Sequence, residues 1–202
     1  MDNAVVKEIA DKYNRIAGSY DTVDWFIPSR WRRRAAGLAC GRVLEVGIGT
    51  GLNLPFYADC CTEILGIDIS SGMLEKAKER ASQCKAPVRL EIMDVQDLPF
   101  AADSFDSVLA AFVFCTVPNP LQGLRECRRV LKPGGKLILL EHTGSGNRAL
   151  RQFMDWLNPF TVRFLGDHIN RDTVEVVAKA GFTGITDNNL LGDIVRLVVA
   201  EK

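Results

Sequence analysis

Val43-Leu-Glu-Val-Gly-Ile-Gly-Thr-Gly51 is the stretch that decides the fold of this chain of 202 residues. It joins an apolar segment, typical of a buried strand, to a turn with glycine at every second position. Glycine tolerates positive φ and lets a ligand approach the backbone closely, and the N–H groups of a following helix would face that ligand. The stretch therefore predicts a strand, a ligand-binding turn and a helix in immediate succession.

Two acidic residues follow at the ends of the next two apolar segments, Asp68 and Asp94. At the carboxyl end of a strand beside the glycine turn, Asp68 would accept hydrogen bonds from both hydroxyls of a ribose. Asp94 would meet the exocyclic amine of adenine, so the sequence predicts a nucleoside site. The glycine spacing is G-x-G-x-G and not the G-x-G-x-x-G of dinucleotide-binding folds, which makes a nicotinamide-dependent oxidoreductase the weaker interpretation.

Apolar segments of strand length alternate with amphipathic helical patterns from about residue 42 onward, which is typical of repeated βαβ units and a parallel sheet. The predicted strands are Arg42–Val46, Glu63–Ile69, Val88–Met93, Phe105–Phe112, Lys136–Glu141, Gly184–Asn188 and Ile194–Ala200. The predicted helices are Val5–Gly18, Pro28–Leu38, Gly72–Gln83, Asn119–Leu131 and Asp172–Ala180. The aromatic stretch Phe153–Leu165, which contains a proline, shows no clear pattern.

Size and charge narrow the class of protein. A chain of this length with 47% hydrophobic residues suits one domain with one core. Lys plus Arg equal Asp plus Glu at 25 each, so no net field attracts DNA or RNA, and we expect no nucleic-acid partner. The sequence lacks a secretory signal pattern and an apolar run of bilayer length, which predicts a cytoplasmic protein. The six cysteines show neither a C-x-x-C pair nor zinc-site spacing, which predicts free thiols.

Taken together, the motifs resemble class I S-adenosylmethionine-dependent methyltransferases. The matching residues, in order and spacing within about 40–142, are Glu45-x-Gly47-x-Gly49-x-Gly51, Asp68, Asp94 and Arg129-Val-Leu-Lys-Pro-Gly-Gly135. The resemblance implies a Rossmann-like, doubly wound α/β fold with seven strands, a mostly parallel sheet with an antiparallel last strand, and helices on both faces. It also implies one domain, with an N-terminal helical lid (1–41), a cofactor-binding core (42–142) and a substrate-side, sheet-closing segment (143–202).

The resemblance further implies the residues of the site. S-adenosylmethionine is the expected cofactor, without a metal. Its expected contacts are Glu45, Gly47, Gly49, Gly51, Asp68, Ile69, Asp94, Val95 and Tyr20. Expected contacts of the methyl acceptor are Tyr13, Cys115, His168 and Asn170. His142 is a candidate base at the end of the fifth strand. Simpler interpretations stay open, since Cys115 and the tyrosines could pack in the core, and His142 could only bond a nearby loop.

A narrower resemblance concerns the acceptor. The N-terminal segment 13–21 is similar to that of quinone and phospholipid methyltransferases. Two segments of the core, 53–57 and 114–120, resemble phosphatidylethanolamine N-methyltransferases. Alkyl-thiol methyltransferases are resembled by residues 141–142 together with the region 156–173. We expect a phospholipid amine as acceptor, with a thiol or a quinone ring carbon as alternatives, or a cofactor-binding regulatory module without turnover. The basic, aromatic segment 25–34 either rests on an anionic membrane or faces solvent.

Overall fold

The seven strands in the described part of the chain join one sheet. The structure is a computed structural model, and it describes residues 3–24, 27–165 and 170–202. The strands are β1 Gly41–Val46, β2 Cys61–Asp68, β3 Val88–Ile92, β4 Phe105–Ala111, β5 Leu131–His142, β6 Thr183–Leu191 and β7 Val195–Glu201. They are ordered β3-β2-β1-β4-β5-β7-β6. β7 pairs antiparallel with both β5 and β6, and the other neighbouring strands pair in parallel. This arrangement confirms the predicted fold class.

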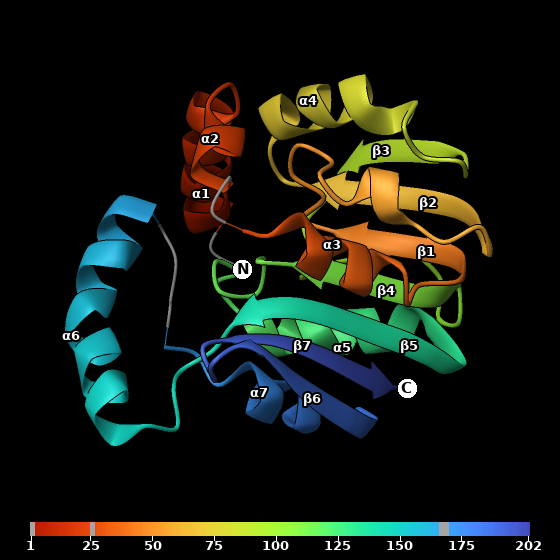
Figure 1. Ribbon diagram of the computed structural model, residues 1–202. Helices are drawn as coiled ribbons and strands as arrows, with labels where there is room; N and C mark the ends of the chain where they lie inside the picture. Colours follow the sequence, from red (N-terminus) through yellow and green to blue (C-terminus); the bar gives the residue numbers. More distant parts are fainter. Residues whose placement is uncertain (1–2, 25–26, 166–169) are drawn as a thin grey trace.

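Helices cover both faces of the sheet (Figure 1). Their bounds are α1 Asn3–Ile16, α2 Tyr20–Asp24, α3 Ser29–Ala36, α4 Ser71–Ala81, α5 Pro120–Val130, α6 Arg148–Leu165 and α7 Thr173–Lys179, with a short 3₁₀ helix at Leu54–Phe56. The apolar sides of α3 and α4 pack on one face of the sheet, and those of α5 and α7 pack on the other. The helix ends agree with the sequence, because Ser70, Asn119 and Asp172 cap α4, α5 and α7 through side-chain oxygens.

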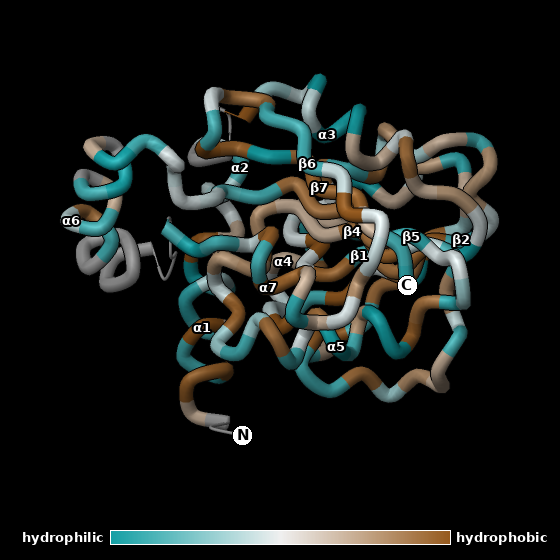
Figure 2. The backbone as a smooth tube through the Cα atoms, turned by 90° about the horizontal axis from the view of Figure 1, so that it is seen from below, coloured by the Kyte–Doolittle hydropathy of each residue, from teal (hydrophilic) through white to brown (hydrophobic). Residues whose placement is uncertain are grey.

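The core lies in the central strands, where Figure 2 shows the hydrophobic segments gathered and the hydrophilic ones outside. Both faces of β1, β4 and β5 are buried, since Val43 and Leu44 are equally inaccessible although they point to opposite sides. A strand covered on both faces needs a continuous apolar run, which is what the sequence has there. Burying each such side chain contributes about 1.5–3 kcal/mol, so these strands fix the position of the turns at their ends.

The helix α6 was not predicted from the sequence. Pro159 lies inside it, and a proline in a helix interior normally argues against a helix. Figure 1 shows α6 standing apart from the sheet, and Trp156 on it is 65% exposed. No helix in the described ranges has both the length and the apolar character that crossing a membrane requires.

Cysteine pairing is a second difference from the sequence analysis, which predicted free thiols. Cys40 and Cys60 form a disulfide, with their Cα atoms 5.1 Å apart. They are 20 residues apart in the chain and become neighbours because β1 and β2 pair in parallel, with Gly41 opposite Cys61. The other four cysteines are thiols.

One glycine in the middle of β2 leaves the space that the glycine turn needs. A Cβ added at Gly66 would lie 2.3 Å from Cδ1 of Ile48 and 2.9 Å from Cδ2 of Leu90. Ile48 belongs to the glycine turn and is buried. We therefore expect Gly66→Ala to lower the free energy of unfolding by about 1–3 kcal/mol through overpacking, as measured by urea denaturation.

The matched control is Gly18→Ala, because a Cβ there meets nothing within 4 Å. That change should leave stability unaltered or raise it by up to about 1 kcal/mol, since alanine restricts the unfolded chain. Equal stability of the two variants would contradict the close packing of Ile48 on β2.

Candidate active site

A cleft opens at the carboxyl ends of β1, β2 and β4, and α1 and α2 lie across it (Figure 1). It encloses about 900 Å³, part of which is open to solvent. The cofactor contacts expected from the sequence that line this cleft are Gly47, Gly49, Asp68, Ile69, Asp94, Val95 and Tyr20. Residues remote in the chain therefore meet at the edge where open α/β sheets bind ligands.

The glycine turn has the backbone that its sequence requires. Gly47, Gly49 and Gly51 adopt φ of 59°, 58° and 82°, which side chains rarely tolerate. A Cβ at Gly47 would also lie 2.5 Å from a methyl group of Val113. Gly51 does not line the cleft; it packs on Ala77 of α4 and so lets the helix approach the turn.

Asp68 fastens this turn to the neighbouring strand. Its carboxylate accepts hydrogen bonds from the backbone N–H of Gly49 at 3.0 Å and of Ser70 at 2.8 Å. Burial raises the pKa of Asp68, and these backbone donors oppose the rise. A carboxylate held in this way on the wall of the cleft could accept further hydrogen bonds from the hydroxyls of a ribose.

Glu45 lies beneath the turn and does not line the cleft. It is 1% exposed, and its two oxygens accept hydrogen bonds from Nδ2 of Asn53 and from the hydroxyl of Tyr57, each at 2.7 Å. Nη1 of Arg32 in turn donates to Oδ1 of Asn53 at 3.1 Å. The sequence predicted a cofactor contact for Glu45; in the structure, Asn53 and Arg32 line the cleft in its place.

The N-terminal helices are fastened over the cleft at two points. Oδ1 of Asn14, on α1, accepts hydrogen bonds from Oγ of Ser70 at 2.7 Å and from the N–H of Gly72 at 2.8 Å, at the start of α4. Asp21, on α2, accepts from the Thr50 hydroxyl at 2.6 Å and pairs with Arg80. These bonds hold Tyr13 and Tyr20, whose rings meet edge to face, on the wall of the cleft.

The loop after β4 supplies a further wall, which contains Phe112. Phe112 adopts a φ of 59°, rare for a bulky residue and therefore a strained conformation. His142 stacks on this ring, with centroids 4.7 Å apart, but does not itself line the cleft. Cys115 is 2% exposed and also stays out of the lining.

Of the two remaining acceptor residues expected from the sequence, Asn170 is described by the structure and lies away from the cleft. Nδ2 of Asn170 donates to Oδ1 of Asp155 on α6 at 2.8 Å, and Asn170 is absent from the lining. His168 lies outside the described residues. The expected acceptor set is thus represented at the cleft by Tyr13.

Sequence reasoning missed Arg32, Asn53, Gln96 and Phe112, all of which line the cleft. For Arg32 a signal existed, because α3 buries Trp31, Arg32, Ala35 and Ala36, the spacing of one helix face. That spacing distinguishes Arg32 from the other arginines of the segment. The other three residues carry no periodic signal.

Comparison with known proteins now identifies the family. Residues 44–139 match the methyltransferase domain family. The chain is 33% identical to the ubiquinone/menaquinone biosynthesis C-methyltransferase UbiE of Geotalea uraniireducens, over 97% of each protein. This chain belongs to the class I S-adenosylmethionine-dependent methyltransferases. The cofactor of this methyltransferase is S-adenosylmethionine, and a turn that only glycine fits, beside a buried carboxylate, suits a nucleoside.

Other relatives cover the methyltransferase less completely. The UbiE protein of Geotalea daltonii is 36% identical over 67% of this chain and 63% of its own length. The phosphatidylethanolamine N-methyltransferase of Cereibacter sphaeroides is 41% identical over 55% of this chain and 56% of its own length. Among solved structures, a possible histamine N-methyltransferase of Thermotoga maritima has a TM-score of 0.67 at 22% identity, over 94% of this chain and 98% of its own, which supports the fold.

The buried Glu45 should make the free energy of unfolding depend on pH. Burial raises its pKa from 4.5 to about 7, opposed by hydrogen bonds from Tyr57 and Asn53 and by the charge of Arg32. Between these two pH values the folded protein keeps the proton and the unfolded chain releases it, so stabilisation present below pH 4.5 is lost as the pH rises through 7. The loss amounts to about 3 kcal/mol at most.

We expect Glu45→Gln to remove this loss. The glutamine amide imitates the protonated acid, because it can donate to the Tyr57 oxygen and still accept from Asn53. Urea denaturation at about pH 5 and about pH 8 measures the difference, with Glu8→Gln on the exposed side of α1 as control. A variant that loses as much stability as the parent across this range would refute the assignment to Glu45.

Proposed function

We propose that this methyltransferase transfers the methyl group of S-adenosylmethionine to a ring carbon of an apolar quinol. The observation that carries the proposal is a group of apolar and aromatic residues in the lining of the cleft, outside the glycine turn. It is formed by Val6, Ile9, Tyr13, Phe112, Val117 and Pro118, and we call it the acceptor wall. A flat, apolar ring suits such a wall better than a charged headgroup, because burying a charge without partners costs free energy.

The names of relatives support the same acceptor. The Geotalea uraniireducens protein, which matches nearly the whole chain, is named for C-methylation in quinone biosynthesis. A protein of Renibacterium salmoninarum, 30% identical over 96% of this chain and 92% of its own length, is named demethylmenaquinone methyltransferase. The sequence led us to expect a phospholipid amine first and a quinone second; the relatives with the fullest match favour the second.

In this proposal, the cofactor lies across the ends of β1, β2 and β3. The open backbone of Gly47 and Gly49 faces its methionine portion, Asp68 accepts from the ribose, and Asp94 with Val95 contacts adenine. When bound, the cofactor supplies a methyl group on a sulfonium, an already activated leaving group. The protein then has to align the acceptor and exclude water, which the two fastened helices over the cleft favour.

Carbon methylation of a quinol proceeds more readily when a ring hydroxyl has lost its proton. Among the described residues that line the cleft, Arg32 alone carries a positive charge. Arg32 lies with its guanidinium 5.6 Å from the Phe112 ring centroid, next to the acceptor wall. A cation on the lining of the cleft would favour loss of the hydroxyl proton, and the resulting phenolate has higher electron density at the ring carbon that receives the methyl group.

A phospholipid amine is the second candidate, favoured by the outer side of α3. Arg30, Arg33 and Arg34 are exposed there, where they could attract an anionic membrane. The Cereibacter sphaeroides relative is named for this reaction, although it matches only about half of the chain. Peripheral membrane contact belongs to this second proposal.

An acceptor panel separates the two. Purified protein with labelled S-adenosylmethionine should transfer label to a reduced, prenylated naphthoquinol, with one ring hydrogen replaced by methyl in the mass spectrum. Phosphatidylethanolamine in anionic vesicles and an alkyl thiol should receive at least about tenfold less, because neither places an apolar ring on the acceptor wall. Transfer to the phospholipid alone would favour the second candidate, and binding of the cofactor without transfer to any acceptor would favour a regulatory module.

His142 provides a second test. Because its ring packs behind Phe112, we infer that it positions this ring and does not remove a proton. His142→Ala should then raise KM for the quinol and lower kcat by less than about tenfold, whereas loss of a general base costs about 10²–10⁴ in rate. His142→Phe should restore the parent KM through ring packing. A fall of kcat by about a thousandfold in both variants would establish His142 as the base.

A further inference from the structure

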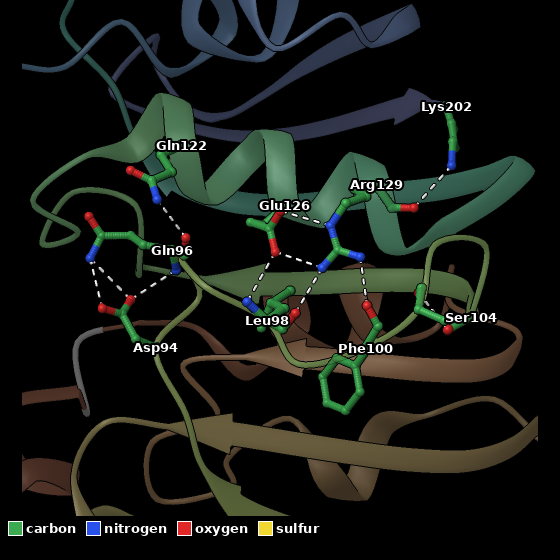
Figure 3. Close-up of polar contacts among 10 residues, drawn as sticks. Asp94, Gln96, Leu98, Phe100, Ser104, Gln122, Glu126, Arg129 and Lys202 are labelled. Atoms are coloured by element: carbon green, nitrogen blue, oxygen red, sulfur yellow. Dashed lines mark hydrogen bonds and ion pairs between the residues drawn. The ribbon is translucent and has the colours of Figure 1, made fainter. Parts of the chain in front are cut away.

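Gln96 is joined to Asp94 at the adenine end of the cleft (Figure 3). Its side-chain Nε2 donates to both oxygens of Asp94, at 3.1 and 2.9 Å, and its backbone N–H donates to Oδ1 at 2.9 Å. The Asp94 carboxylate is therefore held in one orientation by a single residue. A carboxylate has about four acceptor positions, so it can still accept a bond from a ligand.

The orientation of the Gln96 amide is itself determined. Its Oε1 accepts a hydrogen bond from the backbone N–H of Asn119 at 3.0 Å. The backbone carbonyl of Gln96 also accepts a hydrogen bond, from Nε2 of Gln122 at 2.8 Å. Turning the amide over would place its NH₂ group against the Asn119 N–H and its oxygen against Asp94. Gln96 is 4% exposed, so solvent cannot compensate for these mismatches.

We propose that Gln96 is a specificity-determining residue that positions Asp94 as a hydrogen-bond acceptor, so that the cleft selects a base with an exocyclic amine over one with a carbonyl. The inference rests on the proposed nucleoside site and goes beyond it by naming the residue that sets its choice of base. An amide donor supports the negative charge on its partner. A glutamate at position 96 would oppose it, because two carboxylates about 3 Å apart cannot both ionise.

The same residue joins the base end to the acceptor side. Asn119 and Gln122 belong to the start of α5, and Asn119 directly follows Val117 and Pro118 of the acceptor wall. The bonds of Gln96 therefore hold this segment against the loop after β3. A change at Gln96 should affect base selection first, and acceptor binding only through this connection.

The test compares S-adenosylhomocysteine and S-inosylhomocysteine by isothermal titration. In the inosyl ligand a carbonyl replaces the exocyclic amine, and N1 of the base carries a proton. The parent should bind the adenosyl ligand at least about tenfold more tightly, since the carbonyl of the inosyl base meets an acceptor. Gln96→Glu should reduce this ratio to near one or invert it, because the protonated pair can donate to a carbonyl. Gln96→Met, which keeps length and removes the amide, should reduce the ratio as well.

Two further variants calibrate the result. Gln152→Glu makes the same chemical change at an exposed position of α6 and should keep the parent ratio. Asp94→Asn supplies a donor to a carbonyl and should invert the ratio. A folded Gln96→Glu or Gln96→Met protein with the parent ratio overturns the inference, and so does a parent without preference. If the parent binds neither ligand, both the proposed function and this inference fail. If the parent binds the adenosyl ligand but the Gln96 variants keep its preference, only the inference fails.

Discussion

The hydrogen bond from the Gly49 N–H to the Asp68 carboxylate joins the ends of two parallel strands, and the site is arranged around it. The strands hold their ends in register through Val46 opposite Ile67, so the turn after β1 and the carboxylate of β2 cannot move apart. Positive φ at the glycines then directs the backbone toward the cleft, and the gap at Gly66 receives the Ile48 side chain. A bond between neighbouring strands thus orders this side of the cleft.

The carboxylates around the cleft follow one physical rule. Each is buried to some degree and each is compensated by donors from the protein, by backbone N–H groups for Asp68 and by an amide side chain for Asp94 and Glu45. Compensation matters because an isolated buried carboxylate takes up a proton. Glu45, the deepest of them, is the one whose pKa approaches neutrality. Depth within the sheet therefore separates the acids that line the cleft, Asp68 and Asp94, from Glu45, which supports the turn.

The sequence predicted what depends on local pattern. The order of strands and helices followed from apolar periodicity. The glycine turn, Asp68 and Asp94 followed from their places at strand ends, so this part of the cleft lining was predicted from the sequence. The features that the sequence did not predict depend on contacts between distant segments. Arg32 donates a hydrogen bond to Asn53, and Asn119 donates one to Gln96. Cys40 meets Cys60 only once β1 and β2 pair. The helix α6 was missed for a different reason. A proline inside a segment normally argues against a helix, but α6 contains Pro159.

The place of β7 has a consequence for how the chain reaches this fold during synthesis. β5 pairs on one side with β4 and on the other with β7, which follows it by more than fifty residues. Until β7 leaves the ribosome, one edge of β5 has no hydrogen-bonding partner, although its side chains are among the most apolar in the protein. A nascent chain in that state exposes a hydrophobic strand edge that chaperones can bind, and the rate at which the segment between β5 and β7 is translated affects how long the edge is exposed.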